Sequence, residues 1–197
     1  MTKLIIIDTG CANLSSVKFA FDRLGIAAEI SHDLNAIRSA DKLLLPGVGT
    51  ANAAMANLRD RDLIDTIQSL TQPVLGICLG MQLMTDFSVE GNVAALGVIG
   101  GQTEKLPDYG LPLPHMGWNK VRFEADHPLF DGLAQDSYFY FVHSFAVRPN
   151  KHTIATCDYG EPFSAAIGQG NFYGVQFHPE RSGKAGAQLL RNFVEKV

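Results

Sequence analysis

Cysteines are scarce in this sequence, and their placement excludes two kinds of structure. The 197 residues hold three, Cys11, Cys78 and Cys157, which lie far apart, with no Cys-x-x-Cys pair and no histidine nearby at metal-ligand spacing. This pattern disfavours a disulfide framework and a zinc site. We therefore expect no metal, no cofactor and a reducing, cytoplasmic location, and we expect no role for Cys11.

Basic runs and long apolar runs are also missing. The formal net charge is −4, without a cluster of Lys and Arg, and this argues against nucleic acid as a partner. No apolar run approaches the ~18 residues of a membrane span. The N-terminus has only four apolar residues before Asp8, which is too few for a signal-peptide core. We expect neither a nucleic-acid nor a membrane partner.

The first 80 residues alternate between short apolar runs and amphipathic stretches. Runs at 3–8, 27–31, 42–45 and 73–77 are typical of buried strands, and 14–24 and 51–70 are typical of helices. Strand, helix and strand in this order predict parallel βαβ units. Beyond residue 87, alternating runs at 121–123, 137–142 and 153–156 predict antiparallel strands, 164–167 and 171–177 a hairpin, and 184–197 a final helix.

Together these elements predict an α/β fold. We expect one doubly wound, mostly parallel sheet with helices on both faces and antiparallel strands added at one edge. A hydrophobic content of 46% over 197 residues suits a single domain, so residues 1–197 are taken as one unit.

The stretch Gly76-Ile77-Cys78-Leu79-Gly80 connects a predicted strand to a predicted helix. It has the Gly-x-nucleophile-x-Gly pattern of α/β hydrolases, with Cys in the place of Ser. The glycines permit a very tight turn, and the following helix N-terminus favours a thiolate. The Leu79 N–H would face an oxyanion formed on an attacked carbonyl. A plainer interpretation is a buried structural cysteine, because the catalytic one requires a base elsewhere.

A second loop at a predicted strand end is Pro46-Gly47-Val48-Gly49. Proline fixes one dihedral angle and the glycines free the next, so this loop can turn its amides toward a neighbouring site. The N–H near Val48 or Gly49 is therefore a candidate second oxyanion donor. By itself, Pro-Gly-x-Gly is more often a simple turn.

The base is predicted at His178-Pro179-Glu180. In an extended segment, residues two apart point the same way, and Pro179 disfavours a helix there. Glu180 can then hold one imidazole nitrogen of His178 while the other faces the thiol. In isolation this tripeptide indicates an exposed pair at a strand end, but together with Cys78 it predicts a Cys-His-Glu triad.

These three motifs, in this order and over most of the chain, resemble the class I (triad) glutamine amidotransferases. Within that class, Met81 and the stretches 114–119, 140–145 and 178–183 look like the glutaminase subunits of imidazole glycerol phosphate synthases. Other members of the class usually have His where Met81 stands. Two departures from the pattern are Arg181 in place of Lys and Phe145 in place of Tyr.

The resemblance implies hydrolysis of L-glutamine to glutamate and ammonia. Cys78 would attack the side-chain amide, His178 would transfer protons and Glu180 would orient His178. Val48 and Leu79 would form the oxyanion hole. Candidates for holding the glutamine are Gly49, Gln82, Glu90, His143 and Ser144. For Glu90, a solvated surface carboxylate is the simpler account.

The resemblance also implies a partner. The ammonia would pass to a (β/α)₈-barrel cyclase subunit that makes imidazole glycerol phosphate and aminoimidazole carboxamide ribotide in histidine biosynthesis, and the two would form a heterodimer. Asn13, Trp118, Asn119 and Lys184 are the candidates for the facing surface, with ordinary core packing an equally good account of Trp118.

Three other functions remain open from the residues. The chain could be the glutaminase of another synthase, such as the one that makes pyridoxal phosphate, although 114–119 argue against it. A thiol peptidase or γ-glutamyl hydrolase would keep the same triad. A non-catalytic regulatory module would need none of Cys78, His178 and Glu180.

Overall fold

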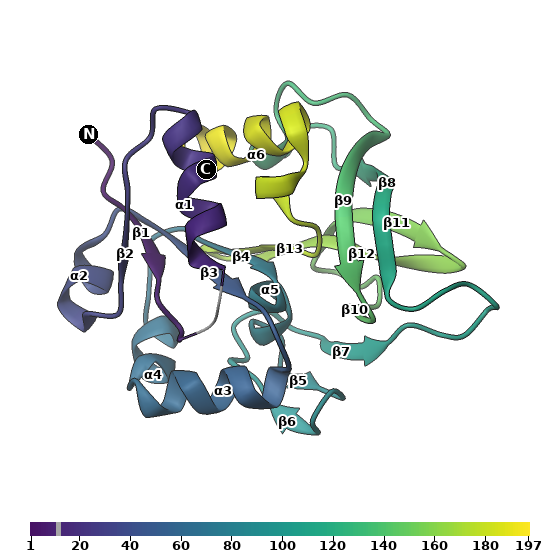
Figure 1. Cartoon of the computed structure of the whole chain (residues 1–197), viewed down its shortest axis with the longest axis horizontal. Coiled ribbons are helices and arrows are strands. Elements are labelled where there is room, and N and C mark those ends of the chain that lie inside the picture. Colours follow the sequence, from purple (N-terminus) through teal and green to yellow (C-terminus); the bar gives the residue numbers. More distant parts are fainter. Residues whose placement is uncertain (11–12) are drawn as a thin grey trace.

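A mixed sheet crosses the molecule in the computed structural model, which describes residues 1–10 and 13–197. Over these residues the sheet has nine strands in the order β2-β1-β3-β4-β13-β12-β11-β8-β9 (Figure 1). The parallel part consists of β2 (Ala28–Ser31), β1 (Leu4–Ile7), β3 (Lys42–Gly47), β4 (Val74–Cys78) and β13 (Phe172–Val175). The antiparallel part adds β12 (Glu161–Gln169), β11 (Thr153–Tyr159), β8 (His115–Phe123) and β9 (Ser137–His143). Cys11, for which the sequence predicts no role, lies outside the described residues.

Helices cover both faces of the parallel part because its strands are apolar on both sides. The residues of β1 are at most 2% exposed, as expected of a strand between two layers. One face packs against α1 (Leu14–Arg23) and α6 (Gly183–Lys196). The other packs against α2 (Leu34–Ser39), α3 (Ala51–Asp60), α4 (Leu63–Gln68) and α5 (Leu79–Leu83). In Figure 1, α1 and α6 lie above the sheet and α3, α4 and α5 below it. The predicted α/β fold is confirmed.

Two differences from the sequence prediction concern a helix and a sheet. The single helix expected over 51–70 is two helices, because Asp62 adopts a left-handed conformation with φ 56° and ends the first. A second sheet, in the order β10-β7-β5-β6, was not predicted. Its strands, β10 (Phe145–Val147), β7 (Gln102–Lys105), β5 (Phe87–Ser88) and β6 (Val93–Ala94), have at most four residues each, too few to show a periodic pattern.

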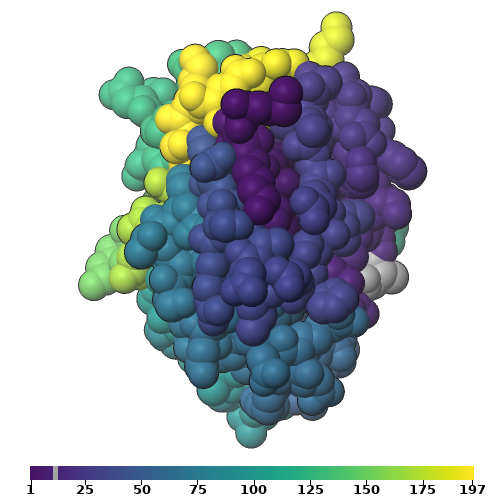
Figure 2. Space-filling view, turned by 90° about the vertical axis from the view of Figure 1, so that its left-hand side faces the viewer, coloured from purple at the N-terminus to yellow at the C-terminus, as the bar shows by residue number. Residues whose placement is uncertain are grey.

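The two ends of the chain lie on the same side of the molecule. Figure 2 shows the first residues, in the darkest purple, beside the yellow C-terminal helix. Lys42 on β3 secures this helix, since its Nζ donates to the carbonyls of Phe193 and Val194 at 2.9 and 2.7 Å. Among the described residues, no helix combines the length and apolar composition that crossing a membrane requires.

Candidate active site

The turn at Cys78 connects β4 directly to α5 without an intervening loop. Cys78 has φ 54° and ψ −111°, a conformation that non-glycine residues rarely adopt. The flanking glycines allow it: a Cβ on Gly76 would lie 2.8 Å from the backbone of Gly80, and a Cβ on Gly80 would overlap the carbonyl oxygen of Leu45. The predicted tight turn is confirmed, and it places the thiol at the carboxyl end of a central parallel strand.

Cys78 opens into a pocket of about 240 Å³. The pocket is lined by the loop after β3, the β4–α5 turn and the β9–β10 connection. The structure brings together here nearly all the residues that the sequence predicts for catalysis and glutamine binding. Those that line it are Val48, Gly49, Cys78, Leu79, Gln82, Glu90, His143, Ser144 and His178. Glu180 lies behind His178.

The pair formed by His178 and Glu180 is almost fully enclosed, with side-chain exposures of 7% and 2%. Nδ1 of His178 lies 2.7 Å from Oε1 of Glu180. The extended conformation predicted for this segment is wrong: Pro179–Arg181 form a 3₁₀ turn, η2. Proline suits the first position of such a turn because its φ is already helical and its missing N–H has no partner to lose. The turn brings the Glu180 carboxylate within hydrogen-bond distance of the imidazole.

The charge of His178 is set by its two neighbours. Burial by itself lowers the pKa of the imidazole, but hydrogen bonds and charge interactions with Cys78 and Glu180 outweigh this and raise the pKa to about 10. At neutral pH His178 is therefore an imidazolium. A histidine held by a carboxylate beside a cysteine is the arrangement that nucleophilic catalysis by cysteine requires.

Two of the glutamine-binding candidates already have structural partners. Nε2 of Gln82 donates to the carbonyl of Phe145 and to Oε1 of Gln176, at 3.0 and 2.9 Å. None of the described residues donates to Oε1 of Gln82, so this oxygen can accept from a ligand. Oε1 of Glu90 accepts from the N–H of Ala51 at 2.8 Å, at the start of α3. Glu90 is thus anchored at the pocket and is not a free surface carboxylate.

His143 lines the pocket as an uncharged ring. Its Nδ1 lies 2.8 Å from the carbonyl of Phe145, which can only accept, so Nδ1 carries the proton. Its Nε2 then accepts from Nδ1 of His115 at 2.9 Å. Burial lowers the pKa of His143 to about 3 and that of His115 to about 4. Both rings are uncharged at neutral pH.

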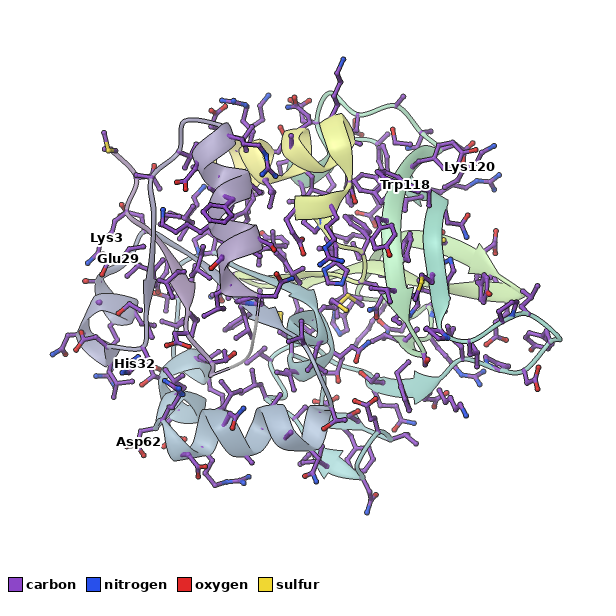
Figure 3. All side chains as sticks on the ribbon, in the orientation of Figure 1. Lys3, Glu29, His32, Asp62, Trp118 and Lys120 are labelled. Carbon is purple, nitrogen blue, oxygen red and sulfur yellow. The ribbon has the colours of Figure 1, made fainter. Side chains whose placement is uncertain are left out.

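The four interface candidates lie in different surroundings. Trp118 is 55% exposed, so core packing does not account for it, and in Figure 3 it lies with Lys120 at the end of the sheet formed by β8 and β9. Lys184 is exposed beside a groove between α1 and α6. Asn13 lines a small cavity with His178 and Glu180. Asn119 points inward, with Nδ2 3.3 Å from Nε2 of His115 and 3.0 Å from the carbonyl of Asp158.

One residue at the site was missed in the sequence-based prediction. Gln176 is fully buried, and its Nε2 donates to Sγ of Cys78 at 3.7 Å. The signal in the sequence that could have identified Gln176 as a site residue is its position two residues before the predicted base, His178. No group of three His, Cys, Asp or Glu side chains suitable for a metal occurs in the described part of the chain.

Comparison with known proteins identifies the family. The model of the family "Glutamine amidotransferase class-I" matches residues 5–197. The subunit HisH of imidazole glycerol phosphate synthase from Mannheimia succiniciproducens is 74% identical over 194 residues, which cover 98% of this chain and all of that protein. The protein of the same name from Escherichia coli K12 is 58% identical and covers 98% of both chains. The chain belongs to the class-I glutamine amidotransferases, in the group of the HisH subunits.

Solved structures of other amidotransferases share the fold. A putative GMP synthase component from Thermoplasma acidophilum has a TM-score of 0.76 at 20% identity and covers 98% of this chain and 93% of its own. A further glutamine amidotransferase has a TM-score of 0.75 at 19% identity, covering 97% of both chains. At this identity the class-I amidotransferase fold is what they share.

Proposed function

We propose that this chain is a glutaminase that hydrolyses the side-chain amide of L-glutamine through Cys78, His178 and Glu180. The observation that carries the proposal is the enclosed His178–Glu180 pair, in which Nδ1 of His178 lies 2.7 Å from Oε1 of Glu180 and the imidazole lines the same pocket as Cys78. Residues 1–197 act as one glutamine amidotransferase domain. The HisH names of the relatives, at up to 74% identity over the whole chain, support glutamine as the substrate.

The reaction follows from the charges. The Cys78 thiolate attacks the amide carbon of glutamine, so a carbon–sulfur bond forms while the carbonyl electrons move to oxygen. His178 gives its proton to the nitrogen as the carbon–nitrogen bond breaks, and ammonia leaves. A water then attacks the thioester and gives a proton to His178 while glutamate is released and the sulfur keeps the electron pair. Glu180 holds Nδ1 of His178 throughout.

The oxyanion of both tetrahedral intermediates would be stabilised by the N–H groups of Val48 and Leu79. Leu79 is the first residue of α5, and the first N–H groups of a helix have no partner within it. Gly47 pairs with Cys78 in the sheet register, which keeps Val48 beside the nucleophile. The glutamine itself would be held by Gly49, Gln82, Glu90, His143 and Ser144.

The ammonia would pass to a (β/α)₈-barrel cyclase subunit in a heterodimer that serves histidine biosynthesis. Support comes from the relatives' names, which describe one subunit of a synthase, and from one surface. Met116, Trp118 and Tyr138 are 63%, 55% and 52% exposed and lie on one face of the β8–β9 pair. Exposed apolar and aromatic groups gathered in this way mark protein interfaces. Lys184, close by at the start of α6, and Asn13 would lie at the same interface, with Asn119 supporting β8 from within.

The test is glutamate release from glutamine by the purified chain, alone and with the cyclase subunit and its ribonucleotide ligand. We expect stimulation by partner and ligand, and loss of activity by at least about 10³-fold in Cys78→Ser. Trp118→Ala should weaken the stimulation and leave activity without the partner unchanged. High activity that ignores the partner would contradict the synthase assignment. Cleavage of γ-glutamyl peptides in place of glutamine would indicate a hydrolase.

A further inference from the structure

A buried amide side chain contacts the nucleophile of the site. Gln176 follows β13 and is 0% exposed. Its Nε2 lies 3.7 Å from Sγ of Cys78, and its Oε1 lies 2.9 Å from Nε2 of Gln82. The proposed steps of glutamine hydrolysis assign no role to this side chain.

The orientation of the Gln176 amide is determined by its surroundings. The carbonyl of Phe145 can only accept, so the atom of Gln82 that faces it at 3.0 Å must be the NH₂ group. The same NH₂ group faces Gln176, which must therefore present its oxygen. Nε2 of Gln176 is left to point at the sulfur. Reversing the Gln176 amide would place two NH₂ groups against each other and an oxygen against the sulfur.

The two protonation states of Cys78 use different partners. A neutral thiol donates to the carbonyl of Val142, 3.9 Å from Sγ. A thiolate has no proton to donate, but it accepts from Nε2 of Gln176. A hydrogen bond made to the charged form of a group favours that form, and bonds to charged partners are stronger than neutral ones. Gln176 therefore acts on the thiolate more than on the thiol.

We propose that Gln176 is a hydrogen-bond donor that stabilises the Cys78 thiolate, and that Gln82 positions it. This rests on the proposed function only in that the thiolate is used as the nucleophile. Unlike His178, whose proton leaves with ammonia, the Gln176 amide loses no proton during the cycle. It is thus available when the thioester collapses and the sulfur again takes up negative charge.

The test measures the thiolate directly, without glutamine. Alkylation of Cys78 by iodoacetamide is followed against pH by mass spectrometry of the Cys78 peptide, which separates it from Cys11 and Cys157. In Gln176→Met the midpoint of the alkylation profile should rise by about one pH unit, because the sulfur loses a donor. Gln82→Met should raise it by less, since the Gln176 amide is then free to rotate. Glutamine kcat should fall by about tenfold in Gln176→Met, with a smaller change in KM.

Asn192→Leu is the matched control. Asn192 is also a fully buried amide, but it donates to the carbonyls of Leu129 and Asp131 beneath α6. The Asn192→Leu variant should have a lower free energy of unfolding, and the midpoint of its Cys78 alkylation profile should not change. An unchanged midpoint in folded Gln176→Met overturns the proposal, and if that variant does not fold, an unchanged midpoint in Gln82→Met overturns it. A shifted midpoint in a protein that hydrolyses no glutamine would instead refute the proposed function alone.

Discussion

His178 and His143 line the same pocket, and each is 6% exposed, yet they carry opposite charge states. The pKa of His178 is raised to about 10, whereas that of His143 is lowered to about 3. Burial lowers the pKa of both. His178 differs because Glu180 and Cys78 hold its proton, while His143 faces the Phe145 carbonyl and the neutral ring of His115. The comparison shows that the neighbours of a buried histidine, more than its burial, decide its charge.

The largest effect is expected from removing the Glu180 carboxylate, which raises the pKa of His178 and has no counterpart at His143. Glu180→Gln keeps an oxygen for Nδ1 of His178 but removes the charge, so the pKa of His178 should fall well below 10. Glutamine hydrolysis should decrease by about 10³–10⁴-fold, as for the orienting member of other triads. The measurements are kcat and the histidine titration by NMR. Glu195→Gln, which removes an exposed partner of Arg191, should change neither.

The opposite change places a carboxylate beside His115, which forms a neutral pair with His143. Asn119→Asp places one about 3.3 Å from Nε2 of His115. An opposite charge at this distance raises a histidine pKa by roughly 1–3 units, so His115 should titrate well above 4. Its Nδ1 still donates to His143, which should stay neutral. NMR titration of the His115 ring decides this, with Asn119→Ala as the uncharged control, and a pKa that stays near 4 would show that burial alone governs this ring.

The smallest effect is expected on the free energy of unfolding at acid pH, to which the neutral histidines contribute. His115 and His143 have pKa values lowered to about 4 and about 3 from 6.5. Between these values and 6.5 the unfolded chain binds protons that the folded chain does not, so the free energy of unfolding falls as pH decreases below 6.5. At pH 5 unfolding should take up about two protons at these residues. His178, with a raised pKa, has the opposite sign: its stabilisation is present below 6.5 and is lost as pH rises toward 10.

Urea unfolding between pH 7 and 5 measures this slope. His115→Gln should reduce the proton uptake at pH 5 by about one, because one of the two low-pKa rings is gone. His32→Gln is the control, since His32 is an exposed histidine near Asp8 at the opposite end of the sheet. Equal slopes in the wild type and His115→Gln would mean that His115 is already protonated in the folded state.

Much of the fold could be predicted because its signals are local. The apolar run of β1, the amphipathic pattern of α6 and the glycines around Cys78 each lie within a few residues, and each element formed where it was expected. The second sheet and the 3₁₀ turn at 179–181 could not be predicted. Their segments are too short to show a periodic pattern.

The active site likewise combines features that the sequence determines with features that depend on the tertiary structure. The sequence by itself determined the tight turn at Cys78, because backbone sterics within a few residues require glycine there. It also determined the order of the three motifs along the chain. Only the tertiary structure decided the contact of Gln176 with Cys78, 98 positions apart, and the neutral pair, which exists because His115 and His143 are partners in the β8–β9 register. Hydrogen bonds between distant strands depend on register and packing, and no local pattern encodes them.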